Sequence, residues 1–172
     1  MKTKSLVLLV AALAAAASGL AADAPKPDVP VRVTYVDPEK FSDVSDELMA
    51  SDGCREQVMA ELRAEIESQA RRYITGGRQL EVKVTDVDLA GGFEPWRGPE
   101  FTRIRIMRDV YPPLMKLEFR LLGADGKVFS GGKRELRRVG YLTTTAWPAD
   151  DPLRYDKENI RAWMRREFGP SA

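Results

Sequence analysis

A change in the spacing of apolar residues is the feature that most limits how this chain can fold. Between Cys54 and Ile74 apolar side chains recur every fourth residue, opposite a charged face: Val58, Leu62, Ile66, Ala70 and Ile74. This spacing is typical of an amphipathic helix. Gly76 and Gly77 follow, and glycine favours the left-handed conformation that often ends a helix. Because the stripe must be buried, we expect this helix to cover a sheet.

Five other segments alternate apolar and polar residues, which is the pattern of strands with one buried face. They are residues 31–36, 80–84, 103–108, 115–121 and a segment that begins at Lys127. In the second of these the alternation slips at Thr85-Asp86. Either a β-bulge restores the register there or the strand ends. Ala124-Asp125-Gly126 predicts a hairpin turn between the last two segments.

A second helix is predicted near the end of the chain. Asp151 offers an N-cap, and Pro152 suits the first helical position. The apolar side consists of Leu153, Ile160, Trp163, Met164 and Phe168, and Gly169-Pro170 ends the helix. The elements together predict one two-layer α+β domain over residues 31–169, in the order β-α-β-β-β-β-α. We expect a mainly antiparallel sheet of four to five strands, with both helices on one face and a polar opposite face in water.

The first 22 residues have the layout of a cleavable secretory signal peptide. Its parts are a basic region at Lys2 and Lys4, an apolar core over residues 6–17, and small residues at Gly19, Ala21 and Ala22. The core is too short and too rich in alanine for a membrane span, which needs ~20 strongly apolar residues. Residues 23–30 hold three prolines and predict an extended tether. We therefore expect an exported, periplasmic protein.

Composition excludes several classes of function. The chain has 27 basic and 26 acidic residues, and loss of Lys2 and Lys4 would leave a net charge of −1. This balance gives no long-range attraction to nucleic acid. Histidine is absent, which removes Ser-His-Asp and Cys-His catalysis and the commonest zinc ligands. Cys54 is the only cysteine, so we expect a small buried hydrophobe, or else a disulfide between chains. The composition favours a protein without enzymatic activity or cofactor.

Several short motifs together resemble a known family. They are VTYVDPEKF at 33–41, VTDVDLAG at 84–91, FEPWRG at 93–98, DVYPP at 109–113 and DPLRY at 151–155. In this combination the chain resembles the proteobacterial family called domain of unknown function 3016, over roughly residues 31–168. The resemblance implies a small, exported, single-domain protein. It implies no catalytic residue, because the family has no established activity.

The candidate binding residues are Phe93, Trp96 and Arg97, in a loop rich in glycine and proline. Aromatic side chains on such a loop often form a contact surface, since they bury much area at little entropic cost. Arg97 beside them could hold a carboxylate or phosphate through two hydrogen bonds. In the alternative interpretation the loop folds over the open end of the core and Trp96 fills it.

The alternative site is carboxylate-based. Asp86 and Asp88, with Asp37 and Asp43 earlier in the chain, could bind a hard cation such as Ca²⁺. They could also act as acid and base if burial moved their pKa values apart. The structural alternative is that these aspartates cap turns or pair with nearby arginines. The sequence thus leaves a cation-binding or hydrolytic site around Asp86 and Asp88 as the second hypothesis.

Two groups of arginines form basic edges in the sequence: Arg103, Arg105 and Arg108, and then Arg134, Arg137 and Arg138. Cross-strand ion pairs, for example with Glu118, would explain them. An anionic envelope partner is the alternative. Tyr111-Pro112-Pro113 predicts a rigid connector between strands, with a polyproline-type surface as the alternative. Our leading hypothesis is a non-enzymatic periplasmic module that binds a protein or a cell-wall component.

Overall fold

The computed structural model describes residues 30–44 and 52–170. The predicted signal peptide and almost all of the predicted tether lie outside the described residues. The larger elements are β1 (Val31–Tyr35), α1 (Asp52–Tyr73), β2 (Gln79–Asp88), β3 (Leu114–Leu122), β4 (Val128–Arg137) and α2 (Arg154–Phe168). Short 3₁₀ helices are η1 (Pro38–Lys40), η2 (Pro95–Arg97), η3 (Pro99–Thr102) and η4 (Tyr141–Thr143).

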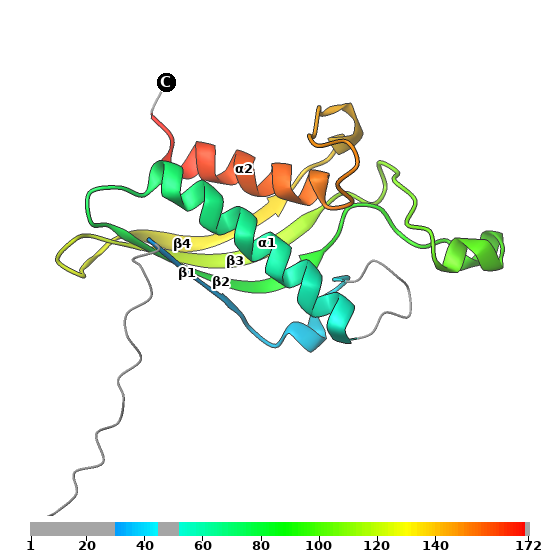
Figure 1. Ribbon diagram of the computed structural model, residues 1–172, viewed down its shortest axis with the longest axis horizontal. Helices are drawn as coiled ribbons and strands as arrows, with labels where there is room; N and C mark the ends of the chain where they lie inside the picture. The colour runs from blue at the N-terminus through cyan, green and yellow to red at the C-terminus, as the bar shows by residue number, and fades with distance from the viewer. Residues whose placement is uncertain (1–29, 45–51, 171–172) are drawn as a thin grey trace, which may run out of the picture.

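Both helices lie on one face of a four-stranded sheet with the order β1-β2-β3-β4 (Figure 1). β1 runs parallel to β2, and the other neighbours are antiparallel. The parallel pair requires a crossover, which α1 supplies. The predicted hairpin turn joins β3 to β4, with Gly126 at φ 75°. These features confirm the predicted α+β fold.

The irregularity in β2 is a β-bulge, which is the first of the two alternatives that the slipped alternation left open. Val84 pairs with Leu117 and Asp86 with Lys116, so Thr85 is the extra residue. Val87 therefore returns to the core, where it is 1% exposed. Asp86 and Asp88 lie on the opposite face of the sheet. The bulge thus places Asp86 and Asp88 on the helix-free face, where an unbroken alternation would have put them in the core.

The predicted strand at residues 103–108 is wrong. This segment belongs to a long loop, residues 89–113, and its only ladder contact in the described chain is a bridge between Ile106 and Gly92. Since β2 pairs directly with β3, no sheet edge is left beside β2 for another strand. The short alternation instead reflects a loop in which Ile104 is 54% exposed and Arg105 is nearly buried.

The core lies between the sheet and the two helices. The stripe predicted for α1 is buried in this core, and Leu62, Ile66 and Ala70 have no exposed surface. From α2, Trp163 packs edge to face on Phe119, with ring centroids 6.0 Å apart. Tyr141, the first residue of η4, has no exposed surface, and its hydroxyl donates to the Arg108 carbonyl oxygen at 3.1 Å. No helix of the described chain combines the length and apolar character needed to cross a bilayer.

The helix-free face of the sheet carries charges of alternating sign, as expected for a face in water. Across the strands the charges form three rows: Arg32, Glu81 and Arg120; Lys83, Glu118 and Lys133; Asp86, Lys116 and Glu135. Two pairs of neighbouring residues form ion pairs: Arg120 with Glu81 at 3.4 Å, and Lys116 with Asp86 at 3.0 Å. Every charge in these rows therefore has a neighbour of opposite sign on the adjacent strand.

Candidate functional site

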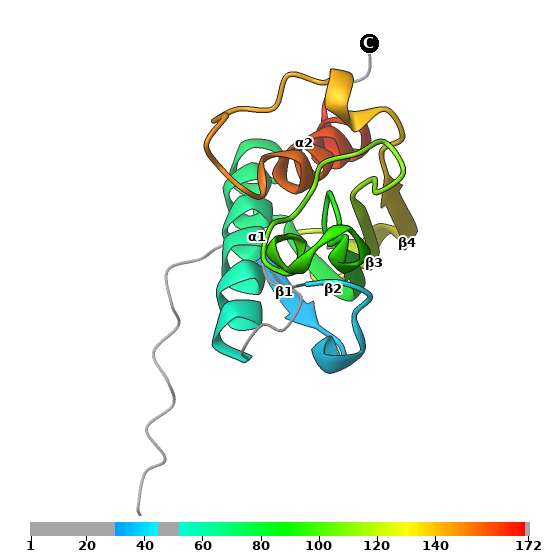
Figure 2. The ribbon, with the colours of Figure 1, turned by 90° about the vertical axis from the view of Figure 1, so that its right-hand side faces the viewer.

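The loops gather at one end of the molecule (Figures 1 and 2). The loop of residues 89–113, with η2 and η3, projects from the body beside the ends of β2 and β3 (Figure 1). Most of the large hydrophobic side chains that are exposed in the described chain belong to this end: Val36, Trp96, Ile104, Val110, Val139, Leu142 and Trp147. This end is therefore the candidate contact region.

A narrow neck closes the base of the projecting loop. Gly92 and Ile106 exchange two backbone hydrogen bonds, with N···O distances of 3.0 and 2.8 Å. Gly91 has φ 81°, and a Cβ atom there would lie 2.8 Å from Met107 Sδ and 2.9 Å from the Ile106 carbonyl oxygen. Only glycine fits this close approach. The neck separates residues 93–105, here called the tip, from the sheet.

Arg105 fixes the neck from the side. Its Nη1 donates to the Gly91 carbonyl oxygen at 2.9 Å, and its Nη2 lies 2.9 Å from the Asp43 carboxylate. The guanidinium also lies over the Phe93 ring, 4.6 Å from the centroid. The Arg105 side chain is only 11% exposed. Arg105 and Phe93 therefore hold the loop in place, and the predicted basic edge at Arg103, Arg105 and Arg108 is not one surface.

A buried carboxylate organises the tip from inside. The Glu94 side chain is 3% exposed and accepts from Arg97 Nη1 at 3.0 Å and Arg108 Nε at 3.2 Å. The Tyr111 hydroxyl donates to the same carboxylate at 3.3 Å. Sequence reasoning did not single out Glu94. The sequence holds no clear signal for its burial, because Glu94 and Glu100 both lie near several arginines and only Glu94 is buried.

Trp96 points away from the core and is 71% exposed. The interpretation in which Trp96 fills the open end of the core is therefore wrong. Trp147 is also 71% exposed, whereas Trp163 has no exposed surface. Arg97, the third predicted binding residue, is 43% exposed and packs over the Phe101 ring at 4.9 Å. Trp96 and Arg97 thus share the tip, and Phe93 lies at its base.

Asp86 is a structural tie between β2 and the segment after β1. Its carboxylate accepts from the backbone N–H and hydroxyl of Ser42, at 2.9 and 3.1 Å, and from Lys116 Nζ at 3.0 Å. Burial alone would raise the pKa of Asp86, but these hydrogen bonds hold it below its usual value. Asp37 lies elsewhere, in a left-handed conformation (φ 50°), with Lys40 Nζ at 2.8 Å.

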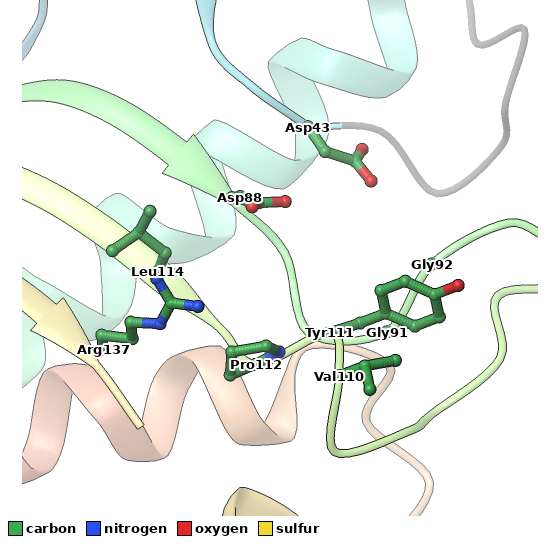
Figure 3. A pocket seen from close by; sticks show the side chains of 9 residues that line it. All are labelled: Asp43, Asp88, Gly91, Gly92, Val110, Tyr111, Pro112, Leu114 and Arg137. Atoms are coloured by element: carbon green, nitrogen blue, oxygen red, sulfur yellow. The ribbon is translucent and has the colours of Figure 1, made fainter. Parts of the chain in front are cut away.

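Asp88 instead lines a cavity of about 200 Å³ between the loop base and the end of the sheet (Figure 3). Burial and the nearby carboxylates of Asp43 and Asp86 raise the pKa of Asp88. Arg137 lines the same cavity from β4. Within residues 30–44 and 52–170, no group of three or more acidic or cysteine side chains is placed to hold a metal ion. Asp86 and Asp88 therefore differ in their surroundings: Asp86 is held by hydrogen bonds, whereas Asp88 lines a cavity.

Asp156 is a buried acid that sequence reasoning missed. One carboxylate oxygen accepts from the Ala90 backbone N–H at 3.1 Å, and the other has no hydrogen-bond partner among the described atoms. Burial raises the pKa of Asp156 to about 7. The sequence pattern of this helix does not predict that Asp156 is buried, because an aspartate in the first turn of a helix ordinarily faces water.

Two further predictions concern single residues. Cys54 is half-buried on the first turn of α1, so the prediction of a buried core residue is wrong. The second basic edge is divided between two faces. Arg134 pairs with Glu167 at 2.7 Å and Arg138 approaches Glu158 at 3.8 Å, both on α2. Arg137 is on the helix-free face.

The comparison with protein families gives one match that covers most of the chain. The model of the family described as "Protein of unknown function (DUF3016)" matches residues 29–166. No curated protein and no solved structure is significantly similar to the sequence. The motifs that carried the resemblance lie within the matched range, among them the segment with Phe93, Trp96 and Arg97. This chain therefore belongs to the DUF3016 family of proteins of unknown function.

Proposed function

We propose that this protein is an exported, non-enzymatic binding module of the cell envelope that contacts another protein through the tip, residues 93–105. The observation that carries the proposal is the 71% exposure of Trp96 at the end of a projecting loop whose conformation is fixed from within. Tryptophan and arginine are the residues that most often dominate binding energy in protein interfaces. Trp96 and Arg97 are adjacent here.

The internal contacts of the tip favour binding over chemistry. Glu94, Arg97 and Arg108 are held by one another, and Arg105 is held by Asp43 and the loop backbone. A loop that is already ordered loses little conformational entropy when it binds. A projecting, rigid, aromatic tip fits a concave, apolar site on a partner.

The charges of the tip favour a protein over an anionic surface. Residues 93–109, which include the tip and the residues just after it, contain four arginines and three acidic residues, Glu94, Glu100 and Asp109. Arg105 is compensated by Asp43, so the projecting loop has no excess of positive charge. A membrane or cell-wall anion would be held by such an excess. Apolar contact through Trp96 is the interaction that remains.

Export rests on the amino-terminal pattern, with Lys2 and Lys4 before the apolar core at residues 6–17. That layout is the one recognised for secretion. A periplasmic partner is consistent with it. The absence of histidine supports a binding role, because it removes the commonest acid–base group.

Photo-crosslinking in living cells tests the proposal. A crosslinking residue replaces Trp96 in the full chain, and a matched control places it at Phe129, which is 74% exposed at the hairpin between β3 and β4. We expect position 96 to give a discrete adduct, identified as a protein by mass, that position 129 does not give. A folded protein without an adduct at position 96, or with the same adducts at both positions, overturns the proposal.

A further inference from the structure

The last row of charges on the helix-free face differs from the other three. In strand order it reads Asp43, Asp88, Leu114 and Arg137. Two acids are adjacent, and the arginine lies beyond an apolar residue. The other rows alternate in sign between neighbours. This row therefore separates its negative end from its positive end, and it does so where the sheet meets the cavity of about 200 Å³.

The opposite charges of this row are not compensated equally. Asp43 has Arg105 at 2.9 Å. The side chains of Asp88 and Arg137 form no hydrogen bond or ion pair within the described chain, and each lines the cavity. Burial and the neighbouring carboxylates of Asp43 and Asp86 raise the pKa of Asp88, although the charges of Arg105 and Arg137 act in the opposite direction. A cation bound beside Asp88 and an anion bound beside Arg137 would each supply the opposite charge that these side chains lack.

The distance between the strands of Asp88 and Arg137 limits which ligand can contact both side chains at once. β3 lies between the strands of Asp88 and Arg137, and neighbouring strands are about 4.8 Å apart, so the two Cα atoms are roughly 10 Å apart. Both residues line the same cavity of about 200 Å³, which admits only a small ligand. An α-amino acid carries an ammonium and a carboxylate on one carbon atom, so it brings both charges into this space. In Figure 3 the carboxylates of Asp43 and Asp88 lie above Arg137, whose guanidinium group ends beside Leu114.

We propose that this cavity binds a small zwitterion of the α-amino acid type. The ammonium group lies at Asp88, the carboxylate lies at Arg137, and the side chain packs on the apolar wall of Val110, Pro112 and Leu114. A bare cation would satisfy Asp88 alone and face Arg137. A bare anion would face the carboxylates of Asp43 and Asp88. The site is separate from Trp96 and does not depend on the protein-binding role of the tip.

Calorimetric titration of the folded protein with each of the common amino acids tests the proposal. Methylamine and acetate serve as half-ligands that carry only one of the two charges. We expect at least one amino acid to bind, with affinity reduced about tenfold or more in both Asp88→Asn and Arg137→Gln. Lys133→Gln, on the same strand and face but outside the cavity, and Trp96→Ala should bind as the parent does.

Three outcomes overturn the proposal. In the first, no amino acid binds at roughly 10 mM, a concentration that detects even weak sites. In the second, an amino acid binds and neither cavity variant weakens it. In the third, methylamine binds as tightly as any amino acid and Arg137→Gln has no effect, which would show a simple cation site. Thermal unfolding of each variant establishes that it is folded, and the two single substitutions serve as independent tests if one fails to fold.

Discussion

Asp156 is a carboxyl group that folding removes from water and leaves with one oxygen unpaired among the described atoms. The residue is 6% exposed, and its burial raises the pKa from 3.8 to about 7. The folded protein therefore keeps this proton to a higher pH than the unfolded chain does. The free energy of unfolding must fall as the pH rises from about 4 to about 7, and the whole cost is present above pH 7.

Asp156→Asn should therefore stabilise the protein at pH 8 and change little at pH 4. The amide oxygen keeps the hydrogen bond from the Ala90 N–H, and the charge that burial disfavours is gone. A pKa shift of this size corresponds to a few kcal/mol, at about 1.4 kcal/mol for each pH unit. Urea unfolding at both pH values measures the difference. An equal effect at pH 4 and pH 8 would show that the charge of Asp156 is not the cause.

Sequence patterns identified exposed and buried residues well only where a periodicity existed. The stripe of α1 gave Leu62 and Ile66 correctly as core. Glu94 and Asp156 have no periodic signal, because their burial depends on partners far away in the chain, such as Arg108 and Ala90. For the same reason the sequence could not decide whether Trp96 is core or surface.

Among the elements, the bulge in β2 is the most informative. Thr85 is the extra residue, and removing it leaves Asp86, Val87 and Asp88 on the faces they already occupy. Deletion of Thr85 should therefore preserve a cooperative fold and cost roughly 1–2 kcal/mol, as an ordinary surface change with one lost hydrogen bond does. Urea unfolding followed by circular dichroism measures this.

Deletion of Glu118 from β3 is the matched control. Glu118 lies in regular pairing with Lys83 and Lys133, so its loss moves the following side chains to the wrong face. We expect this variant to lose cooperative unfolding. If deletion of Thr85 is as damaging as deletion of Glu118, the strand does not contain the bulge.

The elements that the sequence predicted correctly are those with long patterns or specific turn residues. The helix at residues 54–74 and the hairpin at Gly126 are examples, whereas the bulge at Thr85 was one of two alternatives that the sequence left open. The strand predicted at 103–108 failed because six alternating residues do not reveal whether a sheet edge is available to pair with. That information depends on the pairing of β2 with β3, which lies outside the segment.

At the scale of the whole molecule, the projecting tip is attached to the body but contributes nothing to the core. None of the core side chains of the described chain comes from residues 94–104. The neck places Phe93 opposite Arg105, which an Asn-Gly turn can join directly. Replacing residues 94–104 by Asn-Gly should change the free energy of unfolding by no more than about 1–2 kcal/mol. Urea unfolding again provides the measurement.

An equally long replacement at residues 140–150 is the control for this prediction. That segment contains Tyr141, which is fully buried and packs on Tyr155 with ring centroids 4.8 Å apart. We expect its loss to cost about 3–5 kcal/mol, as for other large aromatic residues removed from a core. A tip replacement that is equally destabilising would mean that the tip is part of the folding unit.

The tryptophans also give this protein two separate optical signals. Trp163 has no exposed surface, whereas Trp96 and Trp147 are each 71% exposed. In a Trp147→Phe variant, iodide would quench only the emission of Trp96, and the protected emission would come from Trp163. The fluorescence of one sample would then report the integrity of the core and the occupancy of the tip independently. A ligand or partner could thus be followed without any added label.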